Sequence, residues 1–363
     1  MPHKTGILVR FVQNLQNMKR NLIYAAFALC LLVLTFFTAE KASGREKPQL
    51  VIFDTDIGND VDDVMAMDIL YKYADAGKIK LLAIMGDKDS PYTAECIDIM
   101  NTWYGYPRIP VGTVENGVKK PEYKNYAKYL CELRSQGGSL LFERGTSGKK
   151  EALTPAHILY RKILAAQPDS SVTVVAVGFS TNLARLLDTP ADSLSPLDGR
   201  SLVARKVRLL SVMGGNFSEK SIREYNIVND VPAAQEVFSR WPGKVVVSPF
   251  GLGQKIRFPG KVMAEDMRRY APHPVAEAYV HYRPMPYDRQ TWDLTSVLYA
   301  LEPDKGYFQV SSPGTVVVHD DGVTSFHEAS GGRHFILSVD DGQAESVKRL
   351  FVKILTSAPR HRR

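Results

Sequence analysis

Short apolar runs alternate with amphipathic stretches along the chain from Gln49 onward. The apolar runs are rich in Val, Ile and Leu, as is typical of strands buried on both faces of a parallel sheet. Five runs predict strands, at residues 50–53, 79–85, 172–177, 207–213 and 244–248. Five amphipathic stretches predict helices between them, at residues 61–76, 93–103, 155–166, 182–187 and 232–240. This alternation predicts an α/β fold with a Rossmann-like, mostly parallel sheet flanked by helices.

The pattern changes after Gly306 to short alternating strands separated by glycine turns. It predicts a small β-rich C-terminal part, with strands at 307–310, 315–319, 324–328 and 334–339 and a closing helix at 343–355. The polar, Gly- and Lys-rich stretch 116–150 predicts a surface excursion rather than a domain boundary. We therefore expect a single domain over residues 46–358, followed by a basic tail at 359–363.

The first 45 residues have the order of a secretory signal peptide. Met18-Lys19-Arg20 precedes sixteen uncharged, mostly apolar residues, 22–37, and small residues follow them. The alternative is an uncleaved membrane anchor over residues 22–38, although sixteen residues fall short of the ~20 that a spanning helix needs. We expect an exported protein, periplasmic or secreted, that contacts a membrane only if this segment is not cleaved.

The formal charge of +7 does not indicate nucleic-acid binding. Residues 46–363 carry 40 basic and 38 acidic residues, so the predicted domain is close to neutral and has no basic stripe for a phosphate backbone. Only Cys96 and Cys131 lie in this part of the chain, which allows at most one disulfide and makes a zinc site unfavourable.

Five aspartates lie among ten residues directly after the first predicted strand, in the segment 54–63, which we call the acidic loop. Alternation along a strand predicts that Asp54 and Asp56 point to the same side, and Asp62 and Asp63 open the next helix. So many like charges are costly unless a cation neutralises them, and oxygen ligands favour Ca²⁺ or Mg²⁺ over zinc. The alternative is an acidic surface loop, but the buried strand before it would direct the acids into a crevice of the sheet.

Three further motifs stand at predicted strand ends. They are Val175-Ala176-Val177-Gly178-Phe179-Ser180-Thr181-Asn182, then Met213-Gly214-Gly215-Asn216 with Glu224-Tyr225-Asn226, and Trp292-Asp293 with the helix after it. Together with the acidic loop, and in this order, they resemble the inosine–uridine-preferring nucleoside hydrolase family from about residue 50 to about 301. The resemblance implies hydrolysis of the N-glycosidic bond of nucleosides, and commonly a homo-oligomer.

The resemblance also implies a Ca²⁺ ion at the base of a ribose pocket. Asp56 would be both a ligand and the base that activates a water on the metal. Asp63, the carbonyl of Val177 and the carboxylate of Asp293 would be the remaining protein ligands. The chemistry is consistent, because a divalent ion with a carboxylate can deprotonate water and carboxylates stabilise an oxocarbenium-like ribosyl centre.

The matching motifs imply that Asp62, Glu224 and Asn226 bind the ribose of a nucleoside substrate. Trp292 stands where many members of the family have a histidine that protonates the leaving base. An indole can stack on a base but has no proton to give near neutral pH, so we assign Trp292 to substrate binding. The family's usual source of that proton is therefore missing here.

Other residues of the preceding loop could supply that proton: His281, Tyr282, Tyr287 and Arg289. The acidic loop also departs from the family's common form, because two extra residues, Asp60-Val61, precede the final acid pair. We interpret Asp60 as a solvated turn residue rather than an acid behind the metal ligands. Two other functions stay open: a non-catalytic nucleoside- or ribose-binding protein, and a haloacid-dehalogenase-type phosphatase suggested by Phe53-Asp54-Thr55-Asp56.

Overall fold

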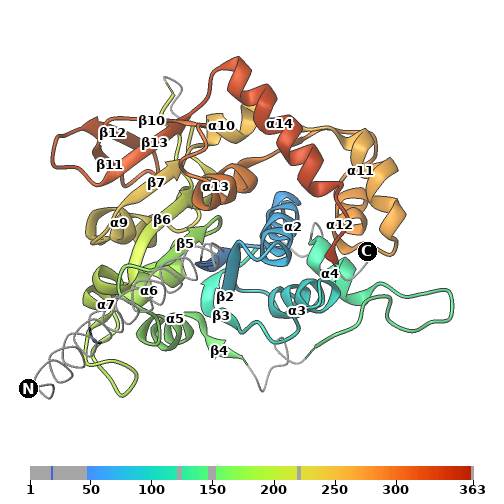
Figure 1. Cartoon of the computed structure of the whole chain (residues 1–363), viewed down its shortest axis with the longest axis horizontal. Helices are drawn as coiled ribbons and strands as arrows, with labels where there is room; N and C mark the ends of the chain where they lie inside the picture. Colours follow the sequence, from blue (N-terminus) through green and yellow to red (C-terminus); the bar gives the residue numbers. More distant parts are fainter. Residues whose placement is uncertain (1–17, 19–46, 121–124, 146–152, 219–221, 361–363) are drawn as a thin grey trace, which may run out of the picture. The chain divides into compact units, whose positions relative to one another are not determined.

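A central sheet organises the protein in the computed structural model, which describes residues 18, 47–120, 125–145, 153–218 and 222–360. The strands are β1 (Gln49–Thr55), β2 (Ile79–Lys88), β3 (Val111–Val118), β4 (Thr154–Pro155), β5 (Val172–Ala176), β6 (Val207–Met213), β7 (Val245–Ser248), β8 (Arg257–Phe258), β9 (Arg289–Gln290), β10 (Gln309–Val310), β11 (Gly314–Val318), β12 (Thr324–Glu328) and β13 (His334–Ser338). Eleven form one sheet in the order β12-β11-β13-β7-β6-β5-β1-β2-β3-β4, with β10 beside β13 (Figure 1). The pairs from β13–β7 to β3–β4 are all parallel, and β10, β11 and β12 pair antiparallel. The predicted fold is confirmed.

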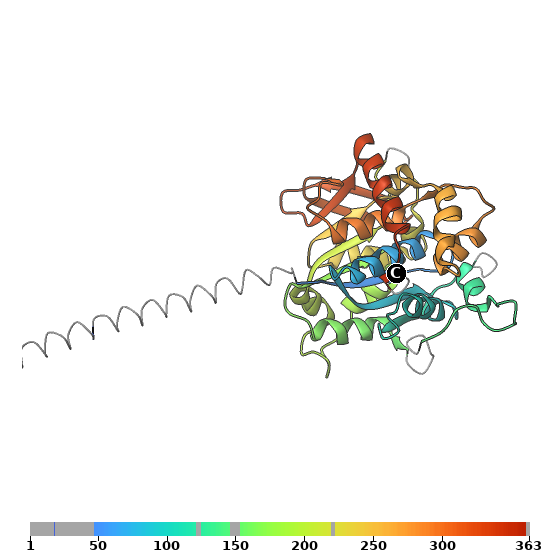
Figure 2. The same ribbon diagram turned by 45° about the vertical axis from the view of Figure 1, so that its right-hand side comes forward.

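Helices cover both faces of the sheet. They are α2 (Asp62–Asp75), α3 (Thr93–Trp103), α4 (Tyr126–Glu132), α5 (Ala156–Ala165), α6 (Thr181–Leu187), α7 (Gly199–Lys206), α8 (Tyr225–Val228), α9 (Val231–Arg240), α10 (Phe250–Lys255), α11 (Gly260–Asp266), η3 (Met267–Tyr270), α12 (Pro274–Tyr282), α13 (Trp292–Leu301) and α14 (Asp341–Leu355). One hydrophobic core contains residues of α2, α3, α4, α12, α13 and α14, and a second contains residues of α5, α6, α7 and α9. The turned view in Figure 2 shows the C-terminal strands and α14 gathered at one end of the sheet.

Strand β1 lies between the two cores. Val51 and Phe53 belong to one core and Ile52 to the other, as expected for a strand buried on both faces. On one side β1 pairs with β2, and on the other with β5, which follows much later in the chain. The chain thus changes direction of winding at β1, and such a switch point leaves a crevice at the C-terminal ends of the strands.

The prediction of a surface excursion over residues 116–150 is wrong in part. Strand β3 extends to Val118, and α4 packs against α3 and α12. Four residues of α4 are buried: Tyr126, Ala127, Leu130 and Cys131. The stretch is polar overall, but a single apolar face on a two-turn helix is enough to dock it onto the core.

Residues Pro48–Arg363 form one compact unit. The predicted leader lies outside the described residues, apart from Met18. Within the ranges that the structure describes, no helix is long and apolar enough to cross a membrane. Cys96 and Cys131 are both buried and not disulfide-bonded.

His334 on β13 is expected to make stability depend on pH. Its ring is buried against Phe238, and its Nδ1 accepts the backbone N–H of Val316 at 2.9 Å. Burial lowers the pKa of His334 from 6.5 to about 4. The unfolded chain therefore takes up a proton near pH 6.5 and the folded protein only near pH 4, so this residue's contribution to stability falls as the pH drops through that window.

The His334→Asn variant keeps an acceptor for Val316 but cannot titrate. Its free energy of unfolding, measured with urea from pH 7.5 to 4.5, should fall less steeply on acidification than that of the wild type. The exposed His319 offers a matched control, because His319→Asn should leave the pH profile unchanged. Parallel profiles for the wild type and His334→Asn would show that the buried imidazole does not carry this dependence.

Candidate active site

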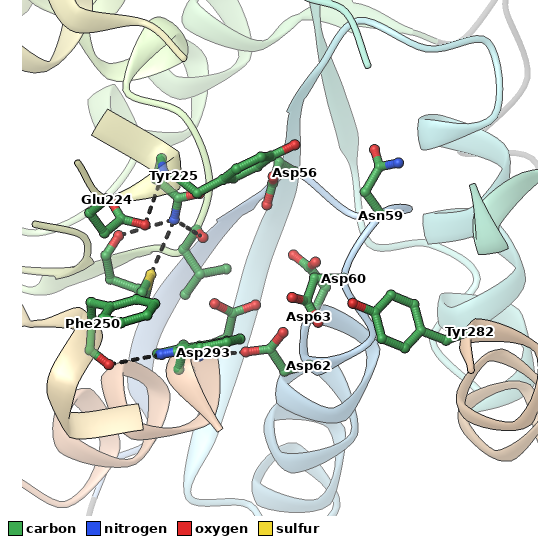
Figure 3. Close-up of a pocket in the computed structure, with 14 residues that line it drawn as sticks. Asp56, Asn59, Asp60, Asp62, Asp63, Glu224, Tyr225, Phe250, Tyr282 and Asp293 are labelled. Atoms are coloured by element: carbon green, nitrogen blue, oxygen red, sulfur yellow. Dashed lines mark hydrogen bonds between the residues drawn. The ribbon is translucent and has the colours of Figure 1, made fainter. Parts of the chain in front are cut away.

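The largest concentration of acidic side chains faces a pocket of about 340 Å³ at the C-terminal ends of β1, β5 and β6 (Figure 3). The pocket is lined by Asp56, Asn59, Asp60, Asp62, Asp63, Val177, Met213, Glu224, Tyr225, Asn226, Phe250, Tyr282, Trp292 and Asp293. All eight residues predicted to bind metal or substrate are among them. They come from four separate regions of the chain, which the sheet's switch point brings together.

The acidic loop bends sharply at Gly58, whose φ is +133°. A Cβ there would lie 2.5 Å from Oδ1 of Asn125 and 2.9 Å from Nζ of Lys88, so a larger residue would displace the loop. The carbonyl of Gly58 accepts the backbone N–H of Tyr126, at the start of α4, at 2.8 Å. Helix α4 therefore holds the bend, and α2 begins immediately after it with Asp62 and Asp63 in its first turn.

Asp63 and Asp62 are both held by hydrogen bonds. The hydroxyl of Thr55 donates to Oδ1 of Asp63, while Oδ2 of Asp63 is buried without a hydrogen-bond partner. Oδ2 of Asp62 accepts the backbone N–H of Asp293 at 3.1 Å, which ties the acidic loop to the start of α13. Burial raises the pKa of Asp62, Asp63 and Asp293 well above the usual range, and the negative charges of neighbouring aspartates raise each further.

Asp56 lies one residue beyond β1 and is buried at the pocket. Burial raises its pKa to about 7, and the nearby ammonium group of Lys88 opposes that rise. Lys88 is itself almost fully buried and ends β2, the neighbouring strand. Lys88 was not selected from the sequence, where it lies beyond the end of the strand predicted at residues 79–85.

Asp54 and Asp56 were predicted to point to the same side of the strand, but they do not line one pocket. Asp54 is fully buried, and its carboxylate accepts hydrogen bonds from the hydroxyl of Tyr160 and the amide of Asn182, each at 2.9 Å. Asp54 does not line the pocket. Asp54 is therefore bonded to residues of α5 and α6, and of the two aspartates only Asp56 lines the pocket.

Val177 follows β5 directly, and its carbonyl accepts Nδ2 of Asn226 at 2.8 Å. The next residue, Gly178, allows the close approach of the two strand ends. A Cβ at Gly178 would lie 2.5 Å from the backbone nitrogen of Asp56 and 2.4 Å from the carboxylate of Asp87. The motif that starts at Val175 thus acts through backbone contact as well as through side chains.

Glu224 caps the short helix α8. Its carboxylate accepts the backbone N–H groups of Gly215, Asn226 and Ile227 at 3.0–3.2 Å. Burial raises the pKa of Glu224 to about 7, and these N–H groups oppose the rise. Nδ2 of Asn226 also lies 3.3 Å from the carbonyl of Met213. Both side chains are therefore oriented before any substrate binds.

Four aromatic residues line the pocket together with the acids: Tyr225, Phe250, Tyr282 and Trp292. The indole of Trp292 packs on the ring of Phe250 at 5.5 Å and donates its Nε1–H to the carbonyl of Phe250 at 2.8 Å. The roles of Tyr225 and Phe250 were not foreseen, because an isolated aromatic residue in a sequence usually indicates core packing. Asn59 was likewise not foreseen.

The candidate proton donors of the loop before α13 differ in position. His281 does not line the pocket, is exposed, and stacks on Tyr129 with ring centres 3.8 Å apart. Tyr282 lines the pocket, whereas Tyr287 and Arg289 lie behind it. The interpretation of Asp60 as a solvated turn residue is incomplete, because its side chain is 37% exposed but also lines the pocket and forms an ion pair with Arg289.

The fold and this site define a class of protein: an α/β enzyme with an acidic, aromatic-lined pocket at the switch point of its sheet. The family model of the inosine–uridine preferring nucleoside hydrolases matches residues 51–353. The chain therefore belongs to that family and is an N-ribosyl hydrolase, which cleaves the N-glycosidic bond of nucleosides. The resemblance drawn from the sequence motifs is confirmed.

Solved structures share the fold at low sequence identity. A plant nucleoside hydrolase is 19% identical with a TM-score of 0.65, and the match covers 86% of this chain and 100% of that one. The inosine–uridine preferring nucleoside hydrolase of Bacillus anthracis is 16% identical with a TM-score of 0.61, covering 84% and 99%. The purine-preferring ribonucleoside hydrolase of Gardnerella vaginalis is 14% identical with a TM-score of 0.62, covering 85% and 98%. A comparison with curated protein sequences gives no significant match.

Proposed function

We propose that the protein hydrolyses ribonucleosides to ribose and free base with the help of a bound Ca²⁺ ion, and that Asp56 is the general base. The observation that supports this proposal most strongly is the convergence of eight residues on one pocket. Carboxylates from the acidic loop meet a carboxylate of α13 and a backbone carbonyl that follows β5. The same residues were selected from motifs far apart in the sequence.

The donor atoms suit a hard divalent cation. Oδ2 of Asp63 is buried without a partner, and the carboxyls of Asp56, Asp63 and Asp293 all have raised pKa values because burial and mutual repulsion disfavour their charged forms. In the part of the chain that the structure describes, no three such side chains already lie within ligating distance of one another. Ca²⁺ and Mg²⁺ prefer carboxylate and carbonyl oxygens, so Asp56, Asp63, Asp293 and the Val177 carbonyl fit as ligands of such an ion.

A divalent cation held by these residues would lower the pKa of a water bound to it. We assign the proton to Asp56, because its carboxylate is buried at the pocket and would lie beside a water held by the ion. The remaining carboxylates face the same pocket and can stabilise positive charge on a ribosyl centre. We assign hydrogen bonds with the ribose hydroxyls to Asp62, Glu224 and Asn226, which line the pocket.

The leaving base has no histidine to protonate it among the residues that line the pocket. Trp292 donates its one N–H to Phe250, and His281 stacks on Tyr129 outside the pocket. We therefore infer that Trp292 binds the base without activating it. Substrates whose leaving group departs unaided should be preferred.

The test is release of free base or nitrophenol by the purified protein from inosine, uridine and p-nitrophenyl riboside, with Ca²⁺ and with a chelator. We expect turnover only with Ca²⁺, and a rate on p-nitrophenyl riboside at least about tenfold above that on inosine. Nucleoside binding without any turnover would instead support the non-catalytic binding protein.

We also propose that the protein is exported, on the strength of the basic, apolar and small-residue order of residues 18–43. N-terminal sequencing of the protein recovered from the periplasm or the medium tests this proposal. A mature chain that begins after about residue 40 supports cleavage. Recovery of the full-length chain from the membrane fraction would show that residues 22–38 act as an anchor.

A further inference from the structure

An ion pair links the acidic loop to the segment before α13. Asp60, one of the two extra residues in the loop, pairs with Arg289 on β9. Arg289 is only 5% exposed, and its guanidinium Nε–H is buried without a hydrogen-bond partner. A buried charge of this kind is costly unless it is paired, so the pair holds the two segments together.

The guanidinium of Arg289 lies between two aromatic rings. It is 5.0 Å from the ring centre of Tyr282 and 4.9 Å from that of Trp292. Both rings line the pocket, whereas Arg289 does not. The arginine therefore forms a layer behind the two rings, and its planar group contacts both at once, which a lysine ammonium cannot reproduce.

The ion pair and the metal-binding half of the pocket share the same two segments. Two residues beyond Asp60, the carboxylate of Asp62 accepts the backbone N–H of Asp293 at 3.1 Å. The acidic loop thus contacts the region of α13 twice, once through a backbone N–H and once through a buried arginine. Of the two contacts, only the ion pair bears directly on the aromatic rings.

A direct electrostatic effect of Arg289 on the substrate is weak by comparison. Asp60 is in contact with the guanidinium, so the two opposite charges cancel most of their field at the distance of the pocket. Arg289 can therefore act mainly through its contacts with the rings of Tyr282 and Trp292. Trp292 also stacks on Phe250 and donates a hydrogen bond to its carbonyl.

We propose that Arg289 and Asp60 are positioning residues that hold the rings of Tyr282 and Trp292 where the leaving base stacks, and that they thereby set the affinity for the base half of the substrate. This inference rests on the proposed hydrolysis of nucleosides. This role also explains why the acidic loop is two residues longer, by Asp60-Val61, than the common form in the family. The longer loop supplies the anion that allows a buried arginine to support the rings.

The test compares Arg289→Met, Arg289→Lys and Asp60→Asn with the wild type, using inosine as substrate and ribose as a competitive inhibitor. We expect KM for inosine to rise about tenfold in all three, with kcat changed less than about threefold and the inhibition constant of ribose unchanged. Arg240→Met is the matched control: Arg240 also pairs with acids, Asp188 and Glu236, but on α9 away from the pocket. It should leave all three constants unchanged.

Each outcome decides the inference. Full recovery of KM in Arg289→Lys would show that charge and not ring position matters, and an unchanged KM in Asp60→Asn would show that the ion pair has no role; either overturns it. If Arg289→Met does not fold, Asp60→Asn decides, because an amide replaces a half-exposed carboxylate with little change of shape. If the wild type turns over no nucleoside, the proposed function fails, and calorimetric binding of inosine and ribose to the same variants still tests the inference.

Discussion

The Asp56→Asn variant is expected to lose turnover of nucleosides by at least about 10²–10⁴-fold while keeping its fold. The amide has nearly the shape of the carboxylate but can neither accept the proton nor carry the negative charge. Burial raises the pKa of Asp56 to about 7, so above that pH the wild-type carboxylate is ionised at a cost that the amide avoids. The variant's melting temperature in a chelator at pH 8 should therefore equal or exceed that of the wild type.

Turnover of inosine and p-nitrophenyl riboside is measured at saturating calcium, so that weaker metal binding does not imitate loss of the base. Asp304→Asn, on an exposed turn after α13, is the control and should retain the wild-type rate. More than a tenth of the wild-type rate in Asp56→Asn would exclude Asp56 as the general base. A much lower melting temperature would show instead that Asp56 is needed for folding.

Calorimetric titration should detect one Ca²⁺ ion per chain in the wild type, and Asp293→Ala should weaken its binding by at least about 100-fold. Losing one carboxylate at a typical ligand distance of ~2.3–2.6 Å removes a charge–charge attraction worth several kcal/mol even at an effective dielectric of ~20. Asp293 comes from α13 and not from the acidic loop, so this variant tests whether the two segments share one ion.

Asp341→Ala is the matched control for Asp293→Ala. Asp341 is likewise an aspartate in the first turn of a helix, α14, but its side chain is 98% exposed. Its loss should leave calcium binding unchanged. Equal affinity in the wild type and Asp293→Ala would remove Asp293 from the ligand set and contradict the proposed site.

The pattern of residue types alone indicated the acidic loop as part of the site, but it did not by itself indicate most of the residues around that loop. Asp56, Asp62 and Asp63 could be selected because five acids directly after a buried strand have few uses other than binding a cation. Glu224 and Asn226 could be selected only through the family's motifs, because a Glu or an Asn on a short helix carries no signal of its own. The sequence did not indicate the roles of Lys88 and Asp60, because the residues that each one interacts with in the site, Asp56 and Arg289, lie far away in the chain.

The sequence by itself determined the mostly parallel sheet, the acidic loop and the family, because alternating apolar and polar positions record burial and motifs record backbone geometry. It did not predict strand β3 or helix α4. The tertiary structure alone decided three matters: that Asp54 bonds to Tyr160 outside the pocket, that Asp60 pairs with a buried Arg289, and that His281 does not line the pocket. Each depends on contacts between segments far apart in the chain. The periodicity of apolar residues shows which face of a helix or strand is buried. It does not show which residues that face contacts.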